Sequence, residues 1–123
     1  MVSFAGLVLE DGTAIYLQII LFIKRAIVAG LISDGDELPS RRYLSTLLGV
    51  NPNTVQKAYR MLEEEGLMQS HTGARSYVLL NDLVKEKVRS ELIEEAARSV
   101  VNSMKQMGID KSEALKLIDR FWD

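Results

Sequence analysis

Apolar side chains recur at helical spacing near the start of the chain. They fall every three or four residues between Ala14 and Gly30, which predicts an α-helix. Thr13 is a suitable N-cap for this helix and Gly30 a suitable terminator. Residues 1–12 are expected to be irregular or extended. The inward face of the helix is expected to contain Ile15, Ile19, Phe22, Ile23, Ala26 and Ile27.

A second apolar stripe lies beside the first on the same predicted helix. It consists of Leu17, Leu21 and Val28. A helix with two apolar faces usually packs against two partners. The second stripe is therefore a candidate for contact with another chain.

Two shorter helices are predicted in the middle of the chain. The stretch SDGDELPS, residues 33–40, carries turn signals and predicts a loop. Ser40 then caps a short helix that ends at Gly49, with an inward set of Leu44, Leu47 and Leu48. Asn51 and Pro52 begin the next helix, which ends at Gly66. Its expected inward set is Val55, Ala58, Tyr59 and Leu62.

A short β-hairpin and two further helices are predicted after Gly66. The stretch LMQSHTGARSYVLL, residues 67–80, has two short runs on either side of a turn, which is typical of a hairpin. Helical periodicity then extends over residues 82–107. Asp110 and Glu113 form a capping box for a last helix. The predicted fold is mainly α with a small hairpin, divided into residues 1–80 and a helical tail, residues 81–123.

Composition narrows the classes of protein to consider. The chain has 123 residues, a net charge of -2, no cysteine and a single histidine, His71. Disulfides and thiolate metal sites are excluded, and no metal or other cofactor is expected. The chain shows no signal peptide, and its most apolar window, IYLQIILFI, is too short to cross a bilayer. We expect a soluble cytoplasmic protein that does not bind a membrane.

One segment lacks carboxylates altogether. No Asp or Glu occurs between residues 38 and 62, although the chain is acidic overall. The two helices of this segment and the tight turn between them form a helix-turn-helix, whose second helix enters the major groove of DNA. The predicted inward set leaves four polar side chains on the outer face of that helix: Asn53, Gln56, Lys57 and Arg60. Such side chains pair with adenine, guanine or phosphate. Residues 63–65, three glutamates, are expected to be solvated surface.

The hairpin then becomes a wing beside the helix-turn-helix. Arg75 lies at its turn, and His71 and Thr72 lie at the approach. A basic wing tip near the minor groove would add contacts to phosphates or to A·T tracts.

Helix-turn-helix spacing also recurs in protein-interaction domains, and an acid-free segment can arise by chance. A winged-helix protein–protein interaction module without DNA binding is therefore the alternative function. An enzyme is not expected, because the chain has no phosphate-cradling glycine loop and His71 has no evident nucleophile beside it.

The stretch GDELPSRRYLSTLLGVNPNTVQKAYRMLEEEGLM resembles the DNA-binding domain of the GntR family of transcriptional regulators. AIYLQI, VNPNTVQKAY and the short tail are similar to the YtrA subfamily, and the match runs over residues 15–78. The resemblance implies a winged helix-turn-helix that binds a pseudo-palindromic operator on double-stranded DNA as a homodimer, usually as a repressor. It implies DNA contacts at Arg42, Asn51, Asn53, Thr54, Gln56, Thr72 and Gly73. With Ser40 and Arg41 from the same motif, and with Lys57, Arg60, His71 and Arg75, these residues make up the expected DNA-binding set.

Two positions depart from the family pattern. Arg75 stands where the family often has a second wing glycine, and Ala14 stands where it usually has proline. A side chain at position 75 either obstructs close approach to the minor groove or inserts into it.

The tail is too short to hold a core of its own, so it is expected to pair with a second copy. The expected dimerisation residues are Leu17, Leu21, Val88, Leu92, Val100, Met104, Leu115, Ile118, Phe121 and Trp122. The identity of any small-molecule effector is not given by the sequence. Such a molecule would act between the two protomers.

Overall fold

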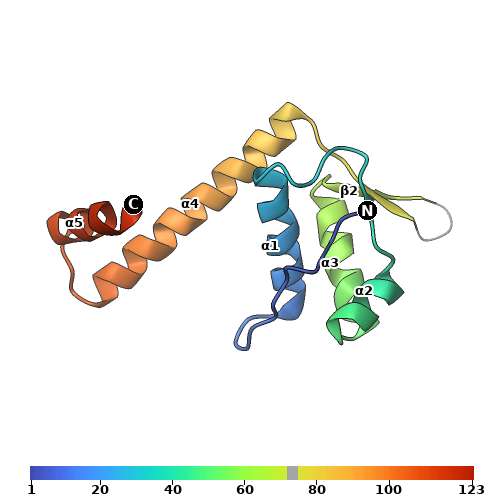
Figure 1. Cartoon of the computed structure of the whole chain (residues 1–123), viewed down its shortest axis with the longest axis horizontal. Coiled ribbons are helices and arrows are strands. Elements are labelled where there is room, and N and C mark those ends of the chain that lie inside the picture. Colours follow the sequence, from blue (N-terminus) through green and yellow to red (C-terminus); the bar gives the residue numbers. More distant parts are fainter. Residues whose placement is uncertain (72–74) are drawn as a thin grey trace. The chain divides into compact units, whose positions relative to one another are not determined.

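The computed structural model describes residues 1–71 and 75–123, which form two compact units, Met1–Arg89 and Ser90–Asp123. The elements are α1 (Ile15–Val28), β1 (Glu37–Leu38), α2 (Arg41–Leu48), α3 (Pro52–Glu64), β2 (Met68–Ser70), β3 (Ser76–Val78), α4 (Asp82–Gln106) and α5 (Lys111–Trp122) (Figure 1). The mainly helical fold class is confirmed. The predicted division of function at residue 80 stays a prediction, and the first compact unit includes the beginning of α4.

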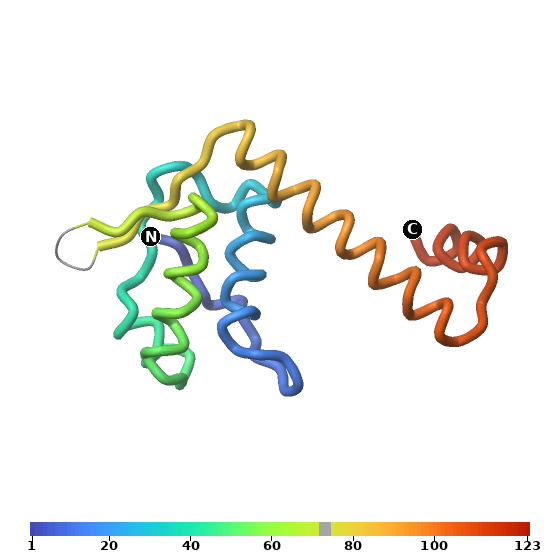
Figure 2. The backbone as a smooth tube through the Cα atoms, turned by 180° about the vertical axis from the view of Figure 1, so that it is seen from behind, coloured from blue at the N-terminus to red at the C-terminus, as the bar shows by residue number. Residues whose placement is uncertain are grey.

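The core of the first unit lies between α1 and α3, which run side by side in both views (Figures 1 and 2). The side chains of Ile19, Ile23 and Ile27 are buried along α1. The predicted inward set of α3 is confirmed, because all four of its side chains are buried: Val55, Ala58, Tyr59 and Leu62. Burial of this apolar stripe fixes which face of α3 remains on the outside.

The wing belongs to a three-stranded antiparallel sheet with the order β1-β3-β2. Met68 pairs with Val78 in the predicted hairpin, and Leu38 of β1 pairs with Ser76 on the other side of β3. The prediction that residues 33–40 form only a loop was wrong, because Glu37 and Leu38 make this third strand. Leu38 is buried, so the strand both pairs its backbone and contributes to the core.

Local capping signals were mostly read correctly. Ser40 accepts a hydrogen bond from the Tyr43 amide (3.1 Å), and Asp110 accepts one from the Glu113 amide (2.9 Å). Thr13 does not cap α1; Ala14 occupies that position without a side-chain bond. The Gln18 amide instead donates hydrogen bonds to the Thr13 and Glu10 carbonyl oxygens, both at 2.9 Å. These bonds hold the segment before α1 against the helix, and the first turn of α1 has no side-chain cap.

The N-terminal segment packs against α1. Val2 and Phe4 are buried, and the Phe4 ring stacks on Phe22 with the centroids 5.2 Å apart. Residues 6–8 line a groove together with Leu21. The chain itself therefore covers part of the second stripe of α1, while Leu17 stays exposed.

The second unit contains the rest of α4, followed by α5. A groove of about 470 Å³ runs between them and is lined by apolar side chains that include Val100, Met104, Ile109 and Leu115. Among the helices of residues 1–71 and 75–123, none combines the length and the apolar character that crossing a membrane requires.

Candidate nucleic-acid interface

The turn between α2 and α3 sets the direction of the second helix. Gly49 adopts a left-handed backbone conformation (φ 68°), which costs free energy for residues other than glycine. Asn51 then accepts a hydrogen bond from the Asn53 amide at 2.8 Å, which caps α3. The side-chain oxygen of Asn51 is therefore engaged within the protein. Its amide nitrogen remains the group that could donate to DNA.

The exposed face of α3 carries polar side chains and no carboxylate over its first nine residues. Asn53, Gln56 and Arg60 follow one another at spacings of three and four and lie on one side of the helix. Lys57 is exposed as well, whereas Thr54 is half-buried. These side chains can donate to guanine or phosphate, or pair with adenine.

The three glutamates after this face have cationic or polar partners. Glu65 forms an ion pair with Lys24 at 2.9 Å, and Glu64 lies 3.9 Å from Arg60 on the preceding turn. Glu63 accepts hydrogen bonds from the amide and hydroxyl of Ser70 at 3.4 and 3.5 Å. They are exposed, as predicted for solvated surface, but they also connect α3 to α1 and to the wing. The positive charge of Arg60, in the same half of α3, is therefore partly neutralised by Glu64.

Arg41 and Arg42 are adjacent in sequence but lie in different surroundings. Arg42 is exposed, whereas Arg41 is half-buried with its guanidinium carbon 5.3 Å from the centroid of the Tyr59 ring. Arg41 Nη2 also donates to Ser70 Oγ at 3.3 Å. Its Nε is buried and has no hydrogen-bond partner in the part of the chain that the structure describes. Arg41 is therefore held by the fold, and Arg42 is free to meet a phosphate.

Tyr59 anchors the same cluster from inside. Its hydroxyl donates to the Pro39 carbonyl oxygen at 2.7 Å, directly before the Ser40 cap. Burial raises the pKa of the Tyr59 hydroxyl well above its ordinary value, and the nearby Arg41 charge opposes that rise only in part. Tyr59 thus stays a neutral donor that fixes the N-terminus of α2 against α3.

Two wing residues of the expected set are described by the structure. Arg75 is exposed and lies 3.9 Å from Glu37 of β1, and its pKa is raised by Tyr77 and, after it, by Glu37. The His71 ring contacts the edge of Tyr77 with the centroids 5.2 Å apart. Thr72 and Gly73 lie outside the described residues. Arg75 is therefore a cation on the wing whose charge is partly neutralised by the Glu37 carboxylate of the same sheet.

The residues expected at a dimer interface differ in exposure. Val88 is buried in the first unit, because it packs within its own chain. Leu21, Leu92 and Met104 are half-buried, and the remaining six are exposed: Leu17, Val100, Leu115, Ile118, Phe121 and Trp122. Leu47, predicted to face inward on α2, is exposed too, so that prediction was wrong. The short α2 buries only the side of Leu44 and Ser45.

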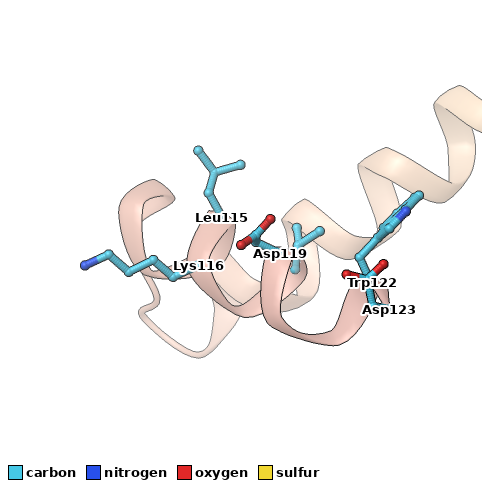
Figure 3. Close-up of a pocket in the computed structure, with 6 residues that line it drawn as sticks. Leu115, Lys116, Asp119, Trp122 and Asp123 are labelled. Carbon is cyan, nitrogen blue, oxygen red and sulfur yellow. The ribbon is translucent and has the colours of Figure 1, made fainter.

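The last helix presents several of these residues together. Leu115 and Trp122 project from one side of α5 with Asp119 between them (Figure 3). Together with Ile118 they line a shallow groove of about 560 Å³. An aromatic side chain as exposed as Trp122 (81%), beside the exposed Leu115 and Ile118, is typical of an interaction surface.

One side chain beside the expected DNA-binding face of α3 was not selected from the sequence. The Tyr16 ring of α1 lies under the Lys57 ammonium group, with Nζ 4.0 Å from the ring centroid. The only sequence signal was its place in AIYLQI, which does not say which residue of α3 the ring meets.

Comparison with known proteins decides the family. Residues 15–78 match the family described as bacterial regulatory proteins, gntR family. The chain belongs to the GntR family. This GntR-family chain is 38% identical over 101 residues to the HTH-type transcriptional repressor YtrA of Bacillus subtilis (strain 168), an alignment that covers 82% of this chain and 73% of that protein. The resemblance to the GntR family and its YtrA subfamily is confirmed.

Solved structures of the GntR family share the fold. A GntR family transcriptional regulator from Listeria monocytogenes has a TM-score of 0.80 at 30% identity, covering 91% of this chain and 98% of that one. YtrA from Sulfolobus acidocaldarius, a GntR-family transcription factor, has a TM-score of 0.55 at 34% identity, covering 91% of this chain and 90% of that one. The GntR-family chain is thus a DNA-binding transcription regulator built on a winged helix-turn-helix.

Proposed function

We propose that this regulator is a homodimeric repressor that acts in the cytoplasm and binds a pseudo-palindromic operator with one α3 helix in each major groove. The observation that carries the proposal is the acid-free outer face of α3, where Asn53, Gln56 and Arg60 lie in line. Carboxylates on this face would meet phosphates, and none is present over residues 38–62.

The roles of individual residues follow from their surroundings. Asn53 and Gln56 are exposed near the beginning of α3 and have the amide groups that pair with adenine. Arg42 is exposed at the first turn of α2, the end of a helix that favours an anion, and is suited to a phosphate. Ser40, Asn51 and Arg41 mainly hold the backbone that presents these groups. Arg75, His71, Thr72 and Gly73 would meet the duplex through the wing.

Two protomers would pair through the apolar surfaces of α4 and α5. Val100, Leu115, Ile118, Phe121 and Trp122 are exposed in a single chain. Burying such side chains is the main favourable term in protein association. A two-fold dimer also matches a palindrome, because it separates two recognition helices by about 34 Å, one turn of the duplex.

An effector, if the regulator has one, would act on this pairing. The groove between α4 and α5, about 470 Å³, lies within the roughly 300 to 1,000 Å³ of small-molecule sites. A ligand there would change the surface that the second protomer meets.

Selection of bound duplexes from a random library tests the proposal. We expect enrichment of an inverted repeat whose half-sites are centred about 10 base pairs apart, or a multiple of that spacing. Repeating the selection with Gln56→Ala should relax preference at one position of each half-site, by about 1 to 3 kcal/mol of discrimination. Enrichment of no sequence by the wild-type protein would contradict the proposal.

The sign of regulation needs its own experiment. The selected site is inserted between a promoter and a reporter gene, and transcription is measured with and without the protein. A repressor lowers the reporter signal, and a site with one half-site scrambled serves as the control. An increase in signal that depends on the intact site would show an activator instead.

A further inference from the structure

Lys57 is the one exposed cation of α3 that an aromatic ring restrains. Its Nζ lies 4.0 Å from the centroid of Tyr16, which belongs to the first turn of α1 and is half-buried. The face of an aromatic ring attracts a cation through its quadrupole. The contact therefore holds a long side chain that would otherwise sample many rotamers.

A second contact shows that α1 and α3 run parallel in a fixed register. Lys24 of α1 forms an ion pair with Glu65 at the end of α3, with the two charged groups 2.9 Å apart. The two residues of this pair are 41 positions apart in the sequence, as are Tyr16 and Lys57, so the two helices advance together in the same direction. The two helices lie side by side (Figure 2). The ion pair and the buried isoleucines of α1 hold the helices together without Tyr16. The ring contact thus lies in the second turn of α3, directly after Gln56.

The direction of Lys57 differs from that of its neighbours on α3. Lys57 lies on the same outer face, four residues after Asn53 and three before Arg60, but its ammonium group is directed to α1, where it lies over the Tyr16 ring. The natural partner of the Lys57 ammonium group is therefore a backbone phosphate at the edge of the groove that Gln56 faces, and not a base edge within that groove.

We propose that Tyr16 is a positioning residue for DNA binding, which holds the Lys57 ammonium group so that it binds a phosphate flanking the major groove. This inference rests on the proposed insertion of α3 into that groove. The ammonium group has three donors and can meet the ring on one side and the phosphate on the other. Because the side chain is ordered before DNA arrives, less conformational entropy is lost on binding.

A double-mutant cycle on the full chain tests the coupling. Wild type, Tyr16→Leu, Lys57→Gln and the double variant are titrated with the selected operator duplex at several salt concentrations. Lys57→Gln should reduce the steepness of the log-log salt dependence by about 0.9 per phosphate, or about 1.8 for a dimer. Tyr16→Leu should weaken binding about 3- to 10-fold, with an unchanged salt slope because the charge remains. In the Lys57→Gln background, Tyr16→Leu should change affinity less than about twofold.

Tyr16→Phe is the matched control, because it keeps the aromatic face and removes only the hydroxyl. We expect its affinity to stay within about twofold of wild type. Thermal unfolding of every variant accompanies the titrations, and Tyr16→Met, which keeps most of the volume, replaces Tyr16→Leu if the latter unfolds at the assay temperature.

Two failures are distinguishable. Equal weakening by Tyr16→Leu in both backgrounds would show that the ring acts through the fold and not through Lys57, which overturns this inference alone. Wild-type protein that binds every duplex alike would overturn the proposed function instead.

Discussion

Arg41 Nη2 donates a hydrogen bond to Ser70 Oγ across 3.3 Å and so joins the beginning of α2 to the first strand of the wing. The same guanidinium lies over the Tyr59 ring, and Ser70 also meets Glu63. One arginine therefore connects α2, α3 and β2. We therefore expect Arg41 to contribute to DNA binding by placing the wing, and the adjacent, exposed Arg42 to contact DNA directly.

Alanine at these two neighbouring positions should separate the two roles. Arg41→Ala removes the wing contact and the packing on Tyr59, so the free energy of unfolding should fall by about 1 to 2 kcal/mol. Arg42→Ala removes an exposed charge and should change it by less than about 0.5 kcal/mol. Arg42→Ala should instead reduce the steepness of the salt dependence of DNA binding by about 0.9 per phosphate. Chemical denaturation and operator titration measure the two effects, and equal destabilisation by both variants would refute the distinction.

The buried hydroxyl of Tyr59 predicts a loss of stability at high pH. Burial raises the pKa of Tyr59 in the folded state above the unfolded value of about 10. The unfolded chain therefore releases this proton first, and the stabilisation present below about pH 10 is lost as the pH rises toward the folded pKa, by about 1.4 kcal/mol per pH unit. Denaturation between pH 7 and 11 measures this slope.

Tyr59→Phe should remove that alkaline slope. It should also lower the free energy of unfolding at neutral pH by about 1 to 3 kcal/mol, because the Pro39 carbonyl oxygen loses its donor. Tyr43→Phe makes the same chemical change at an exposed tyrosine and serves as the control. An alkaline slope that persists unchanged in Tyr59→Phe would assign the titration to another group.

Much of the fold follows from short-range signals in the sequence. The 3.6-residue period predicted the inward set of α3, and the caps at Ser40, Asn51 and Asp110 are as expected. Each of these features depends on residues within a few positions of one another. The helix predicted over residues 82–107 accordingly ends within one residue of α4.

Features that join distant segments could not be predicted in the same way. The β1 strand exists because Leu38 meets Ser76 across the sheet, and Arg41 is held because Ser70 comes beside it. The partner of Lys57 lies 41 residues earlier in the chain. The apolar pattern within one element shows which side chains face outward. Only the packing of several elements shows which of these side chains remain free to bind a partner.

Trp122 should anchor the proposed dimer. Its side chain is 81% exposed in a single chain, and a central aromatic anchor typically contributes 2 kcal/mol or more to an interface. Trp122→Ala should therefore raise the dissociation constant of the dimer by at least about 30-fold. Sedimentation at a series of concentrations measures it.

Leu31→Ala provides the control for that measurement. Leu31 is equally exposed (79%) but lies in the first unit, after α1. Its removal should leave the dimer unchanged. Equal weakening by both variants would mean that lost apolar surface in general, and not the α5 anchor, accounts for the effect.

The salt dependence of operator binding tests the central claim most directly. The claim is that two acid-free α3 faces lie in the grooves of one duplex and are surrounded by phosphate contacts. A dimer that neutralises about 6 to 10 phosphates gives a log-log slope of affinity against salt concentration of about -5 to -9. A slope in that range for the selected inverted repeat is the predicted result, and an affinity that does not change with salt would contradict it.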